Sequence, residues 1–210
     1  MTHSLHRRGT IEDLREDYVL MIKYSRDVKI EGAEDKMRQA WEIISHYEQD
    51  LENFGNHEPN WEADELFNME ELKKANSKII HAVFKDREKL KACLEEIKNK
   101  DLGLSVLISG LYDEVRKICL EIGLAPHTVN QSLGTHGKTE LLPEGETLEI
   151  HTMCGHAMVS PNLIRHTVKE INKGDVSSKD AAKKLRRMCD CAIFNPYRAE
   201  KLLTKMSVKD

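Results

Sequence analysis

The chain has 210 residues, of which 40% are hydrophobic and 32% charged, so it is long enough to bury a core and ordinary for a globular protein. Its 32 Lys and Arg side chains against 36 Asp and Glu give a formal net charge of −4, which provides no electrostatic basis for binding nucleic acid or an anionic membrane. No stretch approaches the roughly 18 consecutive apolar residues of a membrane span. The N-terminal sequence MTHSLHRRGT lacks the apolar segment of a secretory signal, so we expect a cytoplasmic protein.

The first hundred residues are predicted to be a helical region. A capping-box-like start at Thr10 opens a helix that runs through Met21, and apolar residues at helical spacing predict further helices over 33–51, 69–84 and 87–98. The segment 53–60, which contains Gly55 and Pro59, is predicted to be a linker.

Residues 101–210 are predicted to form an α+β region. The apolar run 104–109 and the segments 127–133 and 147–153 are expected strands, and 111–122 is an expected helix. Three more helices begin at Ser160, Ser177 and Asn195, each with a capping residue next to a proline or an acidic partner, and Gly174 ends the first of them. The expected fold class is therefore α+β, mainly helical, with an N-terminal helical region followed by a small sheet with packed helices.

The five cysteines are an odd number, and in a reducing compartment they indicate core residues, metal ligands or reactive thiols rather than a disulfide framework. Cys93 and Cys119 lie on apolar helix faces, where free cysteine behaves as a small buried hydrophobic residue. Both are expected to belong to the core.

Cys154, Cys189 and Cys191 form a different group, because they lie in loops just upstream of two helix N-termini, where amide dipoles favour the thiolate. A Cys-x-Cys pair in a turn after a helix can chelate a metal, and Cys154 would supply a third thiolate. The fourth ligand is expected to be external or one of three histidines: His136, His151 or His156, of which His156 is placed in the predicted site.

Three thiolates suit an iron–sulfur cluster or a Cys3His zinc site. We expect an iron–sulfur cluster with a redox or cluster-based catalytic role, which implies a small-molecule substrate or a protein redox partner. Zinc is the alternative metal, in which case the site would clasp a helical interaction module. A third interpretation is a cofactor-independent thiol enzyme that uses Cys154 with His156 or His136 as its base.

The stretch Cys154-Gly155-His156-Ala157 resembles the nucleophile motif of proline racemases and related cofactor-independent epimerases, over about five residues. The resemblance implies a thiol that carries a proton. Those enzymes need a second cysteine in a matching glycine-rich motif, and the sequence around Cys189 and Cys191 departs from that pattern.

The segment Ser132–Thr139 differs at one position from the phosphate-binding pattern G-x-x-x-x-G-K-[ST]. Such a loop must open a helix, and Pro143 with Gly145 would stop any helix here after one turn. We therefore expect no nucleotide binding. The basic side chains of residues 179–187 are expected to form a solvated helix face, and the N-terminal stretch containing Arg7 is expected to be frayed.

Overall fold

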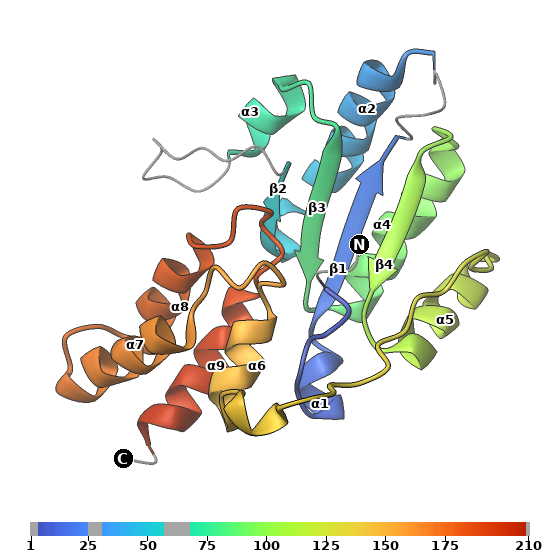
Figure 1. The fold of residues 1–210 in the computed structure, drawn as a ribbon. Helices are drawn as coiled ribbons and strands as arrows, with labels where there is room; N and C mark the ends of the chain where they lie inside the picture. Colours follow the sequence, from blue (N-terminus) through green and yellow to red (C-terminus); the bar gives the residue numbers. More distant parts are fainter. Residues whose placement is uncertain (1–3, 25–30, 57–67, 209–210) are drawn as a thin grey trace.

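The computed structural model describes residues 4–24, 31–56 and 68–208 (Figure 1). They contain a four-stranded antiparallel sheet in the order β2-β3-β1-β4. Its strands are β1 (Tyr18–Lys23), β2 (Leu51–Gly55), β3 (Ile79–Phe84) and β4 (Ser105–Ser109). The central position of β1, with Leu20 opposite both Ala82 and Ile108, suits its almost uninterrupted apolar sequence.

The helices lie on both sides of this sheet and at one end of it (Figure 1). Their bounds are α1 (Ile11–Leu14), α2 (Ala33–Ser45), α3 (Met69–Lys74), α4 (Arg87–Lys100), α5 (Tyr112–Glu121), α6 (Gly145–Thr152), α7 (Pro161–Lys173), α8 (Ser178–Arg186) and α9 (Pro196–Ser207). Short 3-10 turns occur at Glu48–Asp50 and Thr139–Leu141.

The two faces of the sheet belong to two hydrophobic cores. Leu20, Ile22, Ile80 and Phe84 point toward α2, α4 and α5, where Trp41 of α2 is fully buried. Val19 and Val83, which alternate with these residues, join the side chains of the four C-terminal helices α6–α9. The C-terminal helices therefore form a second layer that reaches the sheet through its other face.

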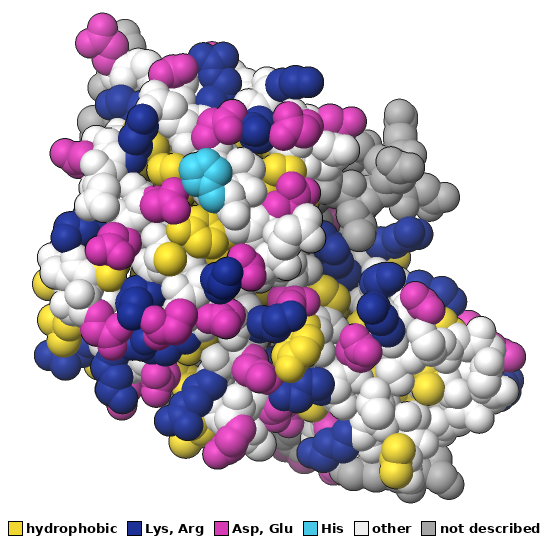
Figure 2. Space-filling model, turned by 180° about the vertical axis from the view of Figure 1, so that it is seen from behind, with side chains coloured by type: hydrophobic (Ala, Val, Ile, Leu, Met, Phe, Trp, Pro, Cys, Tyr) yellow, Lys and Arg dark blue, Asp and Glu magenta, His cyan; other side chains and the backbone are white. Residues whose placement is uncertain are grey.

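The outer surface of the helices α2, α4 and α5 is covered by intermingled acidic and basic side chains (Figure 2). Arg87 of α4, for example, pairs with Glu114 and Glu121 of α5, and Lys91 also reaches Glu121. Such exposed pairs contribute little stability individually, and they leave this face with mixed charge.

The α+β class is confirmed, but the predicted order is wrong. The sheet occupies residues 18–109, and the helices lie mostly C-terminal to it, whereas we expected residues 1–100 to be helical. The predicted helices over 10–21, 33–51 and 69–84 each end early, and β1, β2 and β3 follow them. A strand that is buried on both faces is a short continuous apolar run, which helical periodicity cannot distinguish from a buried helix.

Two predicted strands are also wrong. The segment 147–153 lies almost wholly within α6, and 127–133 is irregular extended chain. In contrast, β4, α4, α5 and the three helices α7–α9 lie where their caps and periodicity placed them, with Gly174 in the left-handed conformation at the end of α7. Of the predicted linker, residues 57–60 lie outside the described residues, and Asn53–Gly55 belong to β2. No described helix combines the length and hydrophobicity that a bilayer crossing requires.

Candidate metal centre

Two turns of the same form lie after α6 and after α8. In Cys154–Ala157 and in Cys189–Ala192, the alanine N–H donates to the carbonyl of the cysteine three residues earlier, at 3.0 Å in both turns. Ala157 and Ala192 have φ values of 59° and 54°, in the left-handed region that disfavours residues with a Cβ atom. Such conformations cost on the order of 1–3 kcal/mol each and cluster at functional sites.

The structure brings the three predicted cysteines and His156 together. The Sγ atoms of Cys189 and Cys191 lie 3.8 Å apart, and the Sγ atom of Cys191 lies 3.6 Å from Nδ1 of His156. The thiol of Cys154 is hydrogen-bonded to that of Cys189. All three cysteines are buried, with at most 4% of their surface exposed.

The other predicted histidine ligands make different contacts. His151 Nδ1 lies 2.8 Å from the carbonyl oxygen of Val159, and its side chain lines a small hollow of about 110 Å³ beside Cys154. His136 lies in an exposed segment, where its Nε2 atom is 3.0 Å from the carbonyl oxygen of Leu133. Of these three histidines, His156 is the one whose ring nitrogen lies 3.6 Å from a cysteine sulfur.

Hydrogen bonds among the three thiols shift their pKa values in different directions. The hydrogen bond to Cys189, together with burial, raises the pKa of Cys154. The hydrogen bond from Cys154 lowers the pKa of Cys189. The hydrogen bond that Cys189 donates to Cys191, together with burial, outweighs this effect and raises the pKa of Cys189 to about 12. At the end of this series, the bond from Cys189 lowers the pKa of Cys191.

Backbone amides also point at the sulfur atoms. The N–H groups of His156 and Met158 donate to Cys154, and the N–H of Ile193 donates to Cys189 and Cys191. Hydrogen bonds from neutral donors favour the thiolate, which is the form that binds a metal. The two turns therefore supply both the thiols and donors that stabilise their deprotonated form.

The contacts among the four side chains run in a row, from Cys154 through Cys189 and Cys191 to His156. Within residues 4–24, 31–56 and 68–208, no three His, Cys, Asp or Glu side chains meet the geometry of a metal site as they stand. Binding a metal at this cluster would thus require side-chain rotation, which would replace the thiol–thiol hydrogen bonds with bonds to the metal.

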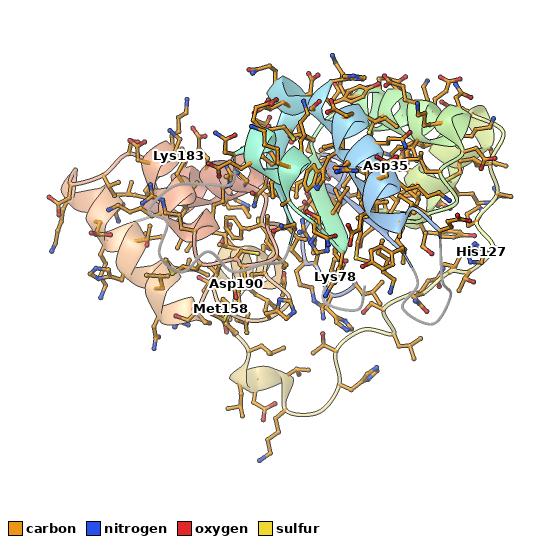
Figure 3. All side chains as sticks on the ribbon, turned by 90° about the horizontal axis from the view of Figure 1, so that it is seen from above. Asp35, Lys78, His127, Met158, Lys183 and Asp190 are labelled. Atoms are coloured by element: carbon orange, nitrogen blue, oxygen red, sulfur yellow. The ribbon has the colours of Figure 1, made fainter. Side chains whose placement is uncertain are left out.

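Asn53 of β2 connects the second turn to the sheet. Its Nδ2 atom donates to the carbonyl oxygen of Phe194 at 2.9 Å, and its Oδ1 atom accepts from Nε of Arg186 at 2.7 Å. Arg186 is half-buried and burial lowers its pKa, so the expectation that all the basic residues 179–187 form a solvated face is wrong for this one. Figure 3 labels Met158, which follows the first turn, and Asp190, which lies in the second, at the edge of the C-terminal helices.

Arg7 connects both turns to the body of the protein. Its Nη2 atom donates to the carbonyl of Met153 at 3.1 Å and also to the carbonyl of Ile193, so one guanidinium holds the residue before Cys154 and a residue after Cys191. Its Nη1 atom pairs with Asp17. The expectation that the N-terminal stretch is frayed is therefore wrong at Arg7, whose side chain is only 6% exposed.

Asp17 is the centre of a buried charge network. Its carboxylate accepts from Arg198 Nη1 at 2.9 Å and from Asn195 Nδ2 at 3.1 Å, in addition to Arg7, and Arg198 also reaches Glu149 at 3.0 Å. Burial alone would raise the pKa of Asp17, but the two guanidinium groups outweigh it and hold that pKa below its ordinary value. The sequence identified Asn195 as a helix cap, but nothing in it linked Asn195 to residues about 180 positions earlier.

Comparisons of the chain with protein-family models, with curated proteins and with solved structures find no match. The function is therefore argued from the geometry and chemistry of the described residues.

Proposed function

We propose that the protein binds a metal ion through Cys154, Cys189, Cys191 and His156, and that the ion is zinc. The observation that carries this proposal is the pair of equivalent turns, each with potential ligands at its first and third positions. Two strained turns some 35 residues apart meet through their thiols and an imidazole. Three thiolates and one imidazole are an established ligand set for a closed, four-coordinate zinc site.

For the Cys189–Cys191 pair, the spacing of the sulfur atoms favours zinc over the iron–sulfur cluster expected from the sequence, and the other ligands would have to rotate toward the ion. A tetrahedral site with Zn–S bonds of about 2.3 Å places its sulfurs about 3.8 Å apart. The Sγ atoms of Cys189 and Cys191 lie 3.8 Å apart. A cluster holds its cysteines farther apart around a larger inorganic core. The iron–sulfur cluster, with its redox or catalytic role, is therefore kept as the alternative that the experiment below must distinguish from zinc.

The thiol-enzyme interpretation has less support. Cys154 is 2% exposed, its thiol is hydrogen-bonded to Cys189, and the pKa of that thiol is raised. A catalytic thiol needs access to its substrate and a stabilised thiolate. The cysteine in contact with His156 is Cys191, which is fully buried.

A zinc ion at this position would join the turn after α6 to the turn after α8. Because the binding free energy of a structural metal is also folding free energy, the ion would stabilise the C-terminal helical layer. The helices of that layer share one core with the cysteines. The proposed role of the site is thus a structural clasp that holds the C-terminal helices in one arrangement.

The test is metal analysis of protein purified without oxygen, followed by cobalt substitution. We expect about one zinc per chain, and after exchange a Co(II) spectrum with intense visible bands and sulfur-to-metal charge transfer. Cys154→Ala, Cys189→Ala and Cys191→Ala should each lose stoichiometric metal, and His156→Ala should weaken binding. Cys93→Ala and Cys119→Ala are the matched controls, because these cysteines are also buried but lie on helices α4 and α5.

Each other outcome has a definite meaning. Iron with acid-labile sulfide, lost in the same three variants, would replace zinc with the cluster. Metal retained in the Cys191 variant, or lost in a folded Cys93 variant, would show that the ligand assignment is wrong. Protein that contains no metal and gives no cobalt spectrum after reduction of its thiols would overturn the proposal.

A further inference from the structure

A cavity of about 660 Å³ lies on the opposite side of β4 from the rest of the sheet. It is bounded by β4, by α5 and by the segment 124–132, which leaves α5 near His127 and continues as an arc toward α6 (Figure 3). The N-terminal residues Ser4, Leu5 and Arg7 also line it. Its volume falls within the range of about 300–1,000 Å³ that is usual for small-molecule sites.

Most of the wall is apolar. The side chains come from α4, β4, α5 and the start of the following segment: Leu94, Val106, Ile108, Val115, Cys119 and Leu124. Several of them pack against the first hydrophobic core, so this wall is rigidly supported. An apolar molecule would replace water along this wall, which is favourable.

Two of the residues that line the cavity carry a buried polar atom without a hydrogen-bond partner among the described residues. Ser4 is 3% exposed and the Arg7 side chain 6% exposed. Neither Oγ of Ser4 nor Nε of Arg7 has a hydrogen-bond partner among the described residues. Nearly all buried polar groups in native proteins are satisfied, so these two atoms beside the cavity lack an acceptor. Both atoms are covered, so a ligand in the cavity would supply that acceptor after a small rotation of the Ser4 or Arg7 side chain.

The charges around the cavity favour an anionic acceptor. Asp17 also lines it, but Arg7 and Arg198 both pair with this carboxylate. Arg116 of α5 adds a further guanidinium to the lining. Guanidinium groups bind carboxylates through charge-assisted hydrogen bonds.

We propose that this cavity binds a small carboxylic acid with an apolar body. The carboxylate lies toward Ser4, Arg7 and Arg116, and the apolar body lies against β4 and α5. This site is separate from the cysteine cluster, because Cys154, Cys189, Cys191 and His156 are not among its lining residues. Octanoate binding and metal binding can therefore be tested separately, although Arg7 contacts both turns and also lines the cavity.

The test is a calorimetric titration of the full chain with octanoate, compared with the isosteric neutral amide octanamide. We expect saturable binding of octanoate with one site per chain, and binding of octanamide at least tenfold weaker. Ala125→Trp should abolish binding without changing the thermal midpoint, because it places an indole in the cavity from an exposed position of the bounding segment. Arg116→Gln should weaken octanoate binding severalfold.

Lys117→Gln is the matched control for Arg116→Gln. Lys117 is the next residue of α5 and carries the same charge, but it is exposed beside Glu114 and does not line the cavity. Equal losses of affinity in the two variants would show that only general charge attraction is at work and would overturn the proposal. So would the absence of saturable octanoate binding, or binding that persists in Ala125→Trp.

Discussion

Replacing Asp17 with asparagine removes the single carboxylate shared by two buried guanidinium groups. The side chains of Arg7 and Arg198 are 6% and 1% exposed, so neither can be solvated when its partner loses its charge. Removing one member of a buried ion pair costs about 3–5 kcal/mol. Arg198 keeps its contact with Glu149, which places the expected loss near the lower value, about 3 kcal/mol.

A loss of about 3 kcal/mol in a domain of this size lowers the thermal midpoint by roughly 6–12 °C. The loss of unfolding free energy should be measured by urea denaturation, and the thermal midpoint by heating, both followed by circular dichroism. Asp35→Asn is the control, because Asp35 also has a lowered pKa and an arginine partner but lies on the exposed surface of α2. Asp35→Asn should leave the midpoint close to that of the wild type. If Asp17→Asn were equally neutral, the network would have no structural importance.

The same network predicts that the free energy of unfolding decreases at acidic pH. The pKa of Asp17 is lower in the folded protein than in the unfolded chain, so the stability it provides is present above about pH 4 and is lost as the pH falls through the folded value. The difference in unfolding free energy between the wild type and Asp17→Asn should therefore shrink between pH 4 and pH 2. A difference that is constant over this range would contradict the assignment of the lowered pKa to Asp17.

Two further predictions concern local conformation. Ala157→Gly and Ala192→Gly should each leave the free energy of unfolding unchanged or raise it by up to about 1 kcal/mol, because glycine adopts left-handed φ without strain. Ala92→Gly, inside α4, should lower it by about 1 kcal/mol in the same urea titration, and a similar loss at Ala157 would show that the turn is not left-handed. ATP should not bind at Ser132–Thr139, because only the 3-10 turn Thr139–Leu141 follows the loop. Micromolar ATP affinity that Lys138→Ala abolishes in calorimetry would refute this.

The parts of the fold that the sequence could predict are those with local signals. The helices α7, α8 and α9 begin at Ser160, Ser177 and Asn195, whose side chains accept the hydrogen bonds expected of N-caps. Gly174 ends α7 for an equally local reason, the left-handed φ of 79°. The turn between α7 and α8 brings the chain back toward its start, which is how Cys154 and Cys189 can meet across the sequence.

The parts that failed depend on partners that are distant in sequence. Tyr18–Lys23 is a strand because β3 and β4 pair with it on both sides, and the sequence around it is equally compatible with a buried helix. Likewise, Leu51 begins a strand because β3 provides a pairing edge, although its apolar spacing continues that of α2. Tertiary pairing decides such segments, and a single sequence contains no record of it.

The residues of the candidate site also differ in whether local sequence signals could indicate them. The sequence could single out the cysteines and His156 as candidates because their residue types carry chemistry wherever they lie, whereas it gave no signal for Arg7, whose importance comes only from what it contacts. Its guanidinium donates to the carbonyls of Met153 and Ile193, one in each turn, while it pairs with Asp17. Arg7 also lines the cavity beside β4. One buried arginine therefore holds together the two turns of the proposed metal centre and also lines the proposed carboxylate site.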